Sequence, residues 1–262
     1  MQEKQSEWRY QWENFPQAEE AFLFDNWIYP TTLQDFEGRD VLECGCGSGR
    51  HTSIVAPLAR SVTAVDLNTA DVARQQRQDL GNVTFVDADL GTMDLGRTFD
   101  IVYCIGVIHH TDNPDRTFET IKRHVRPGGK LIVWAYSREG NWLVANIVEP
   151  ARKALIARLP RRWIWWLSEA LTALMIIPIY TAYHLPLRWL PYYEYFNNFR
   201  RMSFRRNALN VFDKLNAPQT YFIDYGHIRK WFSETDFDQV HISPYCGVSW
   251  RGSGVRRATT QL

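Results

Sequence analysis

The chain has 262 residues, of which 45% are hydrophobic and 14% aromatic. This length suits one large domain or two small ones and allows a sizeable core. A formal net charge of +1 argues against a general nucleic-acid binder, because such proteins are usually strongly basic, so no nucleic-acid partner is expected.

Strand and helix patterns alternate along residues 39–137. Short apolar runs predict strands, and the stretches between them predict helices. The predicted strands are Asp40–Cys44, Val62–Asp66, Val83–Val86, Phe99–Ile105 and Lys130–Tyr136, and the predicted helices are His51–Ala59, Thr69–Gln78 and Pro114–His124. This alternation indicates βαβ units around a parallel sheet.

The rest of the chain divides into three further parts. Residues 1–38 form an N-terminal helical segment, and residues 138–216 are expected to form a separate helical unit. Residues 217–262 supply a helix, Tyr225–Thr235, and two closing strands, Asp238–Ser243 and Val248–Gly252. Within the helical unit, residues 151–206 hold ten Lys/Arg, two Asp/Glu and twelve aromatic residues. This shift in composition sets the segment apart from the rest of the chain.

The four cysteines show neither a zinc-finger spacing nor a disulfide framework. Only Cys44 and Cys46 are close together, and one C-x-C without a second pair is a weak zinc signal. The polar N-terminus contains no apolar segment of a secretory signal. We therefore expect reduced thiols and a cytoplasmic location.

A glycine-rich turn, ECGCGSG, follows the first strand directly. It lies where ligands bind in open α/β sheets, and glycines allow a ligand to approach the backbone closely. Asp66 ends the second strand, where a carboxylate can accept hydrogen bonds from ribose hydroxyls, and Asp89 could take the exocyclic amine of adenine. The dinucleotide pattern G-x-G-x-x-G fails because Arg50 occupies its last position. Glu43 would repel a pyrophosphate but suits a ligand with a cationic amine.

The motifs VLECGCGSGRH, AVDLN, VTFVDADL, FDIVYCIGVIHHTDNP and VRPGGKLIVW, in this order, resemble the class I S-adenosylmethionine-dependent methyltransferases. The resemblance covers residues 40–136. It implies an α/β fold with a Rossmann-like seven-stranded sheet whose last strand is antiparallel, helices on both faces and an inserted helical lid.

The resemblance also implies that S-adenosylmethionine is the cofactor. Glu43, Gly45 and Gly47 would line its methionine part, with Ile105 and Gly106 near the sulfonium. Asp66 would hold the ribose, Leu67 would lie beside the adenine, and Asp89 and Leu90 would face its edge. The implied cofactor-binding residues are Glu43, Gly45, Cys46, Gly47, Gly49, Asp66, Leu67, Asp89, Leu90, Ile105 and Gly106, with Cys46 expected to act as a small packing residue of the turn.

Two features remain open to more than one interpretation. Tyr10–Phe15 resembles a segment that precedes the first strand in some bacterial relatives, where it would fold over the cofactor; a core-packing amphipathic helix is the alternative. His109 and His110 follow the fourth strand, where a general base would act on the acceptor; the alternative is that they shape the loop. Gly106 and His109 occupy positions where metal-binding relatives need carboxylates, so no metal is expected.

The stretch from Trp163 to Leu187 is long and apolar enough to raise the question of a membrane span. One crossing would separate strands of a single sheet, and two crossings need about 40 apolar residues. A lid is therefore expected. Its flanking arginines and tryptophans favour a membrane–water interface. Packing on the same domain or on a second protomer is the alternative.

These features together predict an S-adenosylmethionine-dependent methyltransferase acting on a small or lipid-like acceptor, at oxygen by base rate. The partners would be that acceptor, an anionic membrane surface contacted through residues 151–206, or a second copy of the chain. The location would be cytoplasmic or peripheral on the inner face of the membrane. Rival predictions are a methyltransferase acting on RNA or protein and a non-catalytic cofactor-binding module.

Overall fold

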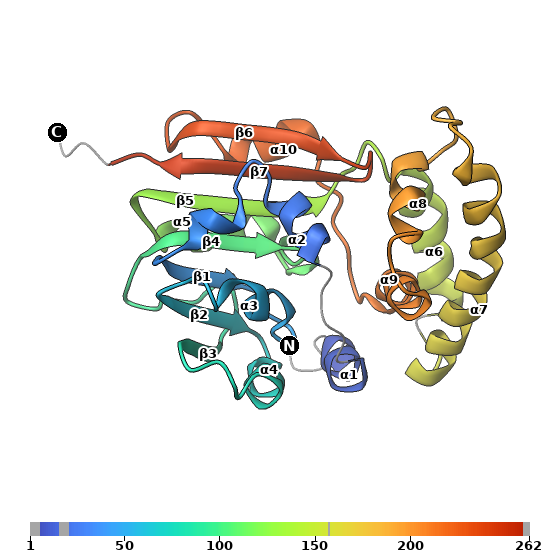
Figure 1. Ribbon diagram of the computed structural model, residues 1–262, viewed down its shortest axis with the longest axis horizontal. Helices are drawn as coiled ribbons and strands as arrows, with labels where there is room; N and C mark the ends of the chain where they lie inside the picture. The colour runs from blue at the N-terminus through green and yellow to red at the C-terminus, as the bar shows by residue number, and fades with distance from the viewer. Residues whose placement is uncertain (1–5, 16–20, 157, 259–262) are drawn as a thin grey trace.

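Seven strands form one mixed sheet in this computed structural model, which describes residues 6–15, 21–156 and 158–258. The strand order is β3-β2-β1-β4-β5-β7-β6. The strands are β1 (Asp40–Cys44), β2 (Ser61–Asp66), β3 (Val83–Asp87), β4 (Phe99–Ile105), β5 (Val125–Tyr136), β6 (Phe237–Tyr245) and β7 (Ser249–Arg256). The first five run parallel and β7 is antiparallel to both neighbours (Figure 1), which confirms the predicted fold class.

Helices cover both faces of the sheet. One face packs against α2 (Ala21–Ile28), η2 (Leu33–Phe36), α3 (Arg50–Val55) and α4 (Ala70–Gln76), and the other against α5 (Pro114–Arg123) and α10 (Tyr225–Trp231). The central strand β4 serves both layers. Ile101, Tyr103 and Ile105 join the first cluster, whereas Val102 and Cys104 join the second. Burial on both faces explains why the sequence of this strand is an almost continuous apolar run.

The fifth strand begins earlier than predicted. Val125 pairs with Phe99, and the ladder then resumes at Lys130 opposite Ile101. Residues 126–129, which precede the predicted strand, therefore lie inside β5 as an irregularity of the ladder, with Gly128 at a φ of +74°. The other strand and helix positions agree with the predictions to within a few residues.

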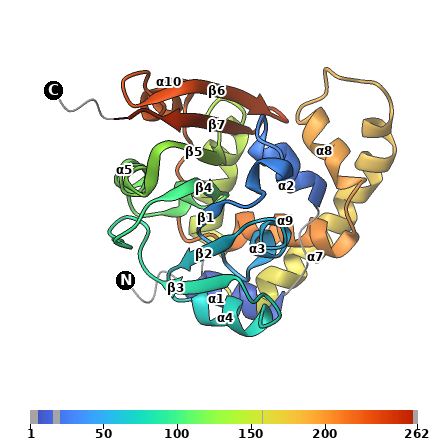
Figure 2. The ribbon, with the colours of Figure 1, turned by 60° about the vertical axis from the view of Figure 1, so that its left-hand side comes forward.

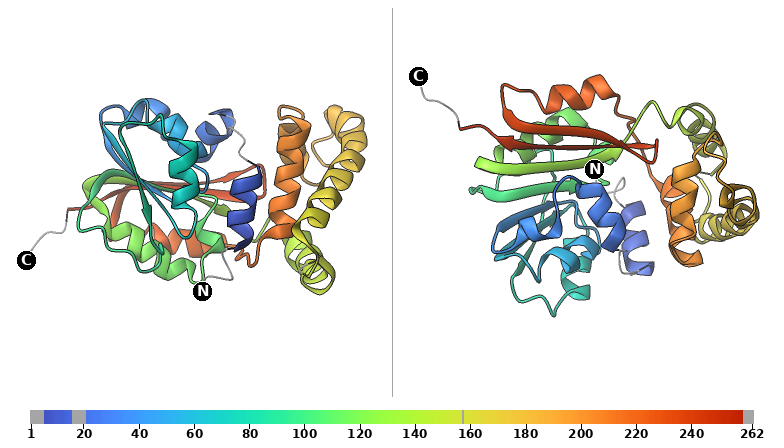
Figure 3. Two further views of the ribbon diagram at one scale, coloured as in Figure 1. Left: turned by 90° about the horizontal axis from the view of Figure 1, so that it is seen from below. Right: turned by 45° about the horizontal axis from the view of Figure 1, so that its top comes forward.

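The helical insertion, residues 138–216, lies beyond the carboxyl ends of the parallel strands (Figures 1 and 3). Its helices are η4 (Val144–Val148), α6 (Glu149–Ala151), η5 (Arg152–Ile156), α7 (Arg161–Tyr180), η6 (Ala182–His184), α8 (Tyr193–Phe199) and α9 (Phe204–Asn216). It has its own small core, in which Ile164 of α7 meets Leu209 and Phe212 of α9. Phe15, just after the N-terminal helix α1 (Ser6–Asn14), completes that core and stacks on Trp165.

Among the described residues, α7 alone is long and apolar enough to cross a membrane, judged by length and composition. The insertion that contains it begins after β5 and ends before α10. Residues Lys130–Tyr136 of β5 pair with residues Ser249–Val255 of β7, so both ends of the insertion return to one sheet. A single crossing by α7 is therefore incompatible with this fold.

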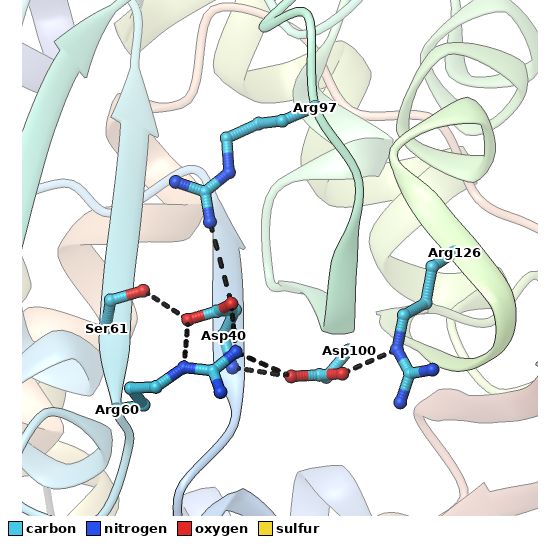
Figure 4. Close-up of polar contacts among 6 residues, drawn as sticks. All are labelled: Asp40, Arg60, Ser61, Arg97, Asp100 and Arg126. Carbon is cyan, nitrogen blue, oxygen red and sulfur yellow. Dashed lines mark hydrogen bonds and ion pairs between the residues drawn. The ribbon is translucent and has the colours of Figure 1, made fainter.

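A cluster of ion pairs joins the strands at the opposite edge of the sheet (Figure 4). The Asp40 carboxylate accepts hydrogen bonds from Arg60 Nε at 2.9 Å and Ser61 Oγ at 2.7 Å. The Asp40 backbone N–H donates to Asp100 at 2.8 Å, and Arg126 Nε lies 2.5 Å from that second carboxylate. The amino-terminal ends of β1, β2, β4 and β5 are thus held together by charge-assisted hydrogen bonds.

The Asp40 ion pairs predict an acid-sensitive contribution to stability. Hydrogen bonds from Arg60 and Ser61 lower the pKa of Asp40 to about 2. A carboxylate with a depressed pKa stabilises the fold above its unfolded value, and this contribution fades as the pH falls from about 4 toward 2. Asp40→Asn should lower the Tm at pH 7 by roughly 2–4 °C, given the screening of a largely exposed ion pair.

Thermal melts followed by circular dichroism at pH 7 and pH 3 would measure this difference. Asp25→Asn, at an exposed position on α2, is the matched control and should leave the Tm unchanged. An equal Tm for Asp40→Asn and the wild type at pH 7 would contradict the assigned role of the cluster.

Candidate active site

Two adjoining cavities open at the carboxyl edge of the sheet. The larger, which we call the outer cavity, has a volume of about 560 Å³, and the smaller, the inner cavity, about 120 Å³. The larger volume falls in the range of small-molecule and cofactor sites. The residues that line both cavities are Trp8, Trp12, Gly45, Gly47, Gly106, Val107 and His110.

The glycine turn after β1 forms the floor shared by the cavities. Gly45 and Gly47 have φ values of +88° and +54°, a conformation that side chains rarely adopt. A Cβ at Gly45 would collide with Val107, and one at Gly47 would lie 2.7 Å from the Trp12 ring. Glycine is therefore required at both positions because the β4 loop and α1 pack directly onto the backbone.

Asp66 stands at the wall of the outer cavity, at the end of β2. Its carboxylate accepts a hydrogen bond from Gly47 N–H at 2.7 Å. Burial raises the pKa of Asp66 to about 6, although hydrogen bonds from Thr69 and the backbone oppose the shift. The carboxylate is thus a strong acceptor held in place by the glycine turn.

The outer cavity continues past the ends of β2 and β3. Leu67, Asp89 and Leu90 line it. Asp89 accepts a hydrogen bond from Gly91 N–H at 2.7 Å, which orients its carboxylate. An acceptor between two leucines suits a flat, apolar ring with an amine at its edge.

The remaining predicted cofactor residues separate into two groups. Cys46 and Ile105 line the inner cavity, and Gly106 lines both. Glu43 and Gly49 line neither. Glu43 is 1% exposed and accepts a hydrogen bond from Thr52 of α3, and its Oε1 atom has no hydrogen-bond partner among the described residues. This carboxyl therefore lies beneath the turn rather than at its surface, and its burial there raises its pKa.

The two adjacent histidines differ in whether they line the cavities. His110 lines both cavities, and its Nδ1 lies 2.8 Å from the carbonyl oxygen of Gln219. Because a carbonyl accepts, Nδ1 carries the proton and Nε2 carries the lone pair. Burial lowers the pKa of His110 to about 4, so its imidazole is neutral at pH 7.

His109 is 0% exposed and lines neither cavity. Its ring packs against Tyr136 at 4.3 Å and His110 at 4.2 Å between ring centroids. Burial lowers its pKa far below the usual value. The structure therefore supports the loop-shaping interpretation for this residue and places only His110 where it can meet a ligand.

The N-terminal helix α1 lies between α4 and the insertion (Figures 1 and 2). Arg9 donates to Asn68 O at 2.8 Å and forms an ion pair with Asp71 of α4 at 2.8 Å. On the other side, Glu7 meets Arg161 of α7 at 2.6 Å, and its carbonyl accepts from Asn216 of α9. Helix α1 thus bridges the core of the sheet and the insertion.

The side chains of residues 10–15 point to two different surroundings, the core of the insertion and the two cavities. Tyr10 and Phe15 pack into the core of the insertion, whereas Trp12 lines both cavities. Trp8 was not predicted as a site residue, and its ring centroid lies 4.9 Å from that of His110. The i, i+4 spacing of the two tryptophans on one helix face was the available signal.

Several residues of the inner cavity come from distant parts of the chain and were not predicted. Trp134 and Tyr136 extend from β5, and Asn210 and Asp213 from α9. Lys214, next to them, donates to Tyr195 at 3.0 Å and lies 5.2 Å from the Tyr136 ring centroid. These residues form no local motif, so their meeting depends on how the insertion folds back.

Comparison with known proteins agrees with this geometry. Residues 42–133 match the family model described as a methyltransferase domain. A ubiquinone biosynthesis O-methyltransferase of Coxiella burnetii is 33% identical over 117 residues, which cover 43% of this chain and 50% of that protein. An uncharacterized protein of Synechococcus is 32% identical over 138 residues, 47% of this chain and 33% of that protein.

A solved O-methyltransferase family protein from Burkholderia thailandensis shares the fold. It superposes with a TM-score of 0.53 at 14% identity, over 91% of this chain and 57% of that one. Over residues 42–133 the chain is thus similar to methyltransferase domains. It spans only half or less of the length of the two curated relatives described above.

S-adenosylmethionine is the cofactor of this family, and the methyltransferase domain has room and chemistry for it. The outer cavity is large enough, and the Asp66 carboxylate at its wall suits a pair of ribose hydroxyls. Asp89 and the two leucines beside it suit an adenine. The pattern of one partly buried carboxylate at or just past the end of each of two neighbouring strands therefore fits a nucleoside.

The raised pKa of Asp66 predicts pH-dependent cofactor binding. Ribose hydroxyls would donate to the ionised carboxylate, and with a pKa of about 6 the ionised fraction falls about tenfold between pH 7 and pH 5. The Kd for S-adenosylmethionine, measured by calorimetry, should rise by about the same factor. Asp66→Ala should weaken binding severely at every pH while the fold survives.

Asp66→Asn is the matched control, since it keeps the shape of the side chain and removes the titration. Its affinity should be low and independent of pH across this range. An unchanged affinity for either variant at pH 7 would show that Asp66 does not hold the ribose.

Proposed function

We propose that the protein transfers a methyl group from S-adenosylmethionine to an oxygen atom of a small or hydrophobic, lipid-linked acceptor. The observation that carries this proposal is the neutral imidazole of His110 at the junction of the two cavities. Transfer to oxygen is supported by the C. burnetii relative, which is named an O-methyltransferase.

The cofactor would be held along the carboxyl edge of the sheet. Asp66 would bind the ribose hydroxyls, and Asp89 the adenine amine between Leu67 and Leu90. The backbone at Gly45, Gly47 and Gly106 would border the methionine part, with Cys46 and Ile105 packing beside it. Glu43 and Gly49 would act indirectly, by supporting the turn. When bound, S-adenosylmethionine supplies an electrophilic methyl group, so the protein must mainly position the acceptor and accept its proton.

His110 would act as the general base. Its Nδ1–H is engaged by the Gln219 carbonyl, so Nε2 is the atom that would accept the acceptor's hydroxyl proton. Because the pKa of His110 is about 4, its imidazole is unprotonated at pH 7, and the lone pair on Nε2 is available to take the proton as the acceptor oxygen attacks. His109 would hold the loop in place through its packing on Tyr136.

The two helical parts would close the site. Residues 1–38 would cover the cofactor, because Trp8 and Trp12 of α1 line both cavities. Residues 138–216 would form the lid over the acceptor, because Asn210 and Asp213 of α9 reach the inner cavity. Between them they would exclude water from the reaction.

Nucleic acid as the acceptor is disfavoured by the state of the basic run at residues 200–206. Arg206 is 4% exposed and bonds within its own helix, and Arg200 donates to the Tyr183 carbonyl at 2.9 Å. Arg201 lies over the Phe22 ring at 3.8 Å. Three of the four arginines in this run thus have internal partners, so the run offers few guanidinium groups to phosphates.

The apolar and basic composition of the lid suits two kinds of partner. An anionic membrane surface contacted through residues 151–206 would suit a hydrophobic acceptor and a location on the inner face of the membrane, whereas a homodimer would bury the same surface between two copies. A cytoplasmic location is proposed in either case.

A variant of His110 would test the base. His110→Ala should lower turnover by about a hundredfold or more and change the Kd for the cofactor by far less. Turnover is measured as release of S-adenosylhomocysteine with an extract that supports the wild type. Added imidazole should restore part of the rate, since it can occupy the vacated space.

His227→Ala, on α10 and outside both cavities, is the control and should retain full activity. Wild-type turnover in His110→Ala would remove this residue as the base.

The acceptor itself can be identified by mass spectrometry. Lipid and metabolite extracts are incubated with the protein and S-adenosylmethionine carrying a deuterated methyl group, and one labelled methyl on an oxygen of a small molecule is expected. Label on RNA or protein would favour the rival acceptors. A protein that binds the cofactor yet releases no S-adenosylhomocysteine with any extract would be a non-catalytic module.

A further inference from the structure

The long helix α7 buries polar side chains and exposes large apolar ones, unlike an ordinary surface helix. Its buried side includes Ser168 and Thr172, which are 0% and 1% exposed. Their hydroxyl groups donate to the backbone carbonyls of Ile164 and Ser168, each at 2.7 Å. A helix at a water-exposed surface normally directs its polar residues outward and its apolar residues inward. Here two small polar residues share the inner side with Ile164 and Ile179.

The outer side of α7 carries a row of large apolar residues that we call the α7 stripe. Its members and their exposed fractions are Trp163 51%, Trp166 56%, Leu174 66%, Ile177 66% and Tyr180 53%. Their spacing places them within about 120° of one another around the helix, along a length of about 25 Å. Ala170 and Ala173 fill the gaps between them.

The α7 stripe is a surface of the whole molecule and not a wall of the candidate site. Figures 1 and 3 place α7 at the edge of the insertion farthest from the sheet. None of its five residues lines either cavity. An acceptor already in the site would therefore not cover it, which leaves these five side chains exposed among the described residues.

Exposed basic residues stand at both ends of the stripe. Arg158 and Arg162 precede it, and Arg188 follows it beside Trp189, which is 77% exposed. Tryptophans and tyrosines between arginines are typical of helices that lie in the interface of a membrane, where anionic head groups meet the basic side chains. The charge pattern thus complements an anionic lipid surface.

We propose that the α7 stripe docks on an anionic lipid bilayer, with α7 lying parallel to the membrane in the head-group region. Crossing the bilayer is excluded because the inner side of α7 packs on α9 and both ends of the insertion return to one sheet. A second copy fits less well, since two such segments, each with ten basic and two acidic residues, would repel one another. The inference deepens the proposed function and rests on it for the hydrophobic acceptor.

Vesicle flotation without cofactor tests the contact separately from catalysis. Wild-type protein should float with equimolar phosphatidylglycerol and phosphatidylcholine vesicles and bind pure phosphatidylcholine vesicles far less. Leu174→Ser with Ile177→Ser should reduce the bound fraction about fivefold. Arg158→Gln with Arg162→Gln should weaken binding to the anionic vesicles and reduce its salt dependence.

Tyr225→Ser, at an aromatic residue on α10 that is 45% exposed, is the matched control and should float like the wild type. Calorimetry with S-adenosylmethionine should give wild-type affinity for every variant, which separates loss of docking from loss of the cofactor site. Brominated lipids should quench less fluorescence in Trp163→Phe with Trp166→Phe than in the wild type.

Absence of wild-type flotation at low salt, or equal flotation of the stripe variant, would overturn the proposal. So would a concentration-dependent dimer in analytical ultracentrifugation that the stripe substitutions dissociate, because the stripe would then be a self-interface. If docking holds while no extract yields methylated product, the membrane contact stands and the proposed activity fails.

Discussion

The antiparallel pairing of β5 with β7 is the constraint on which the rest of the structure depends. It joins seven residues on each side across the sheet, Lys130–Tyr136 with Ser249–Val255. The helical insertion leaves the sheet after Tyr136 and returns beside it, where Ile223 forms a bridge with Ser137, so it lies over the carboxyl ends of the strands. This ladder decides that α9 reaches the inner cavity and that α7 cannot cross a bilayer.

The two edges of the sheet use carboxylates in opposite ways. At the amino-terminal edge Asp40 and Asp100 are paired with arginines, which keeps them ionised and ties neighbouring strands together. At the carboxyl edge burial raises the pKa values of Glu43 and Asp66. Burial of such ionisable groups lowers the stability of the fold, and hydrogen bonds from a bound ligand can offset this loss. The carboxylates at the amino-terminal ends of the strands thus stabilise the sheet, whereas those at the carboxyl ends lie at or beneath the candidate site.

Helix α1 couples the three functional parts of the molecule. Arg9 holds it to the core, Glu7 and Gln11 hold it to the insertion, and its tryptophans face the cavities. A movement of the insertion would therefore be transmitted to the cofactor cavity through one short helix. The outer side of the insertion, with its α7 stripe, lies at the other end of the same connected unit.

Local features of the sequence were sufficient for the sheet, and most of the residues predicted to bind the cofactor line one of the two cavities. Apolar runs of the right length predicted the strands because parallel strands are buried on both faces, and Asp66 and Asp89 follow from their places at strand ends. The early start of β5 was missed because its first pair lies across an irregular segment that reads as a turn. Glu43 was expected to line the cofactor, yet packing against Thr52 places it beneath the turn.

The sequence by itself determined the succession of strands along the chain, the chemistry of the glycine turn and the apolar, basic character of the insertion, because each depends on residues that are neighbours along the chain. Only the tertiary structure decided that His110 meets both cavities while His109 is buried, and that α7 turns Ser168 and Thr172 inward and Trp163 and Trp166 outward. These outcomes depend on which face of a turn or helix is covered by a segment about a hundred residues away, such as Gln219 beside His110, or by a neighbouring helix, such as α9 beneath α7. No local pattern encodes that choice.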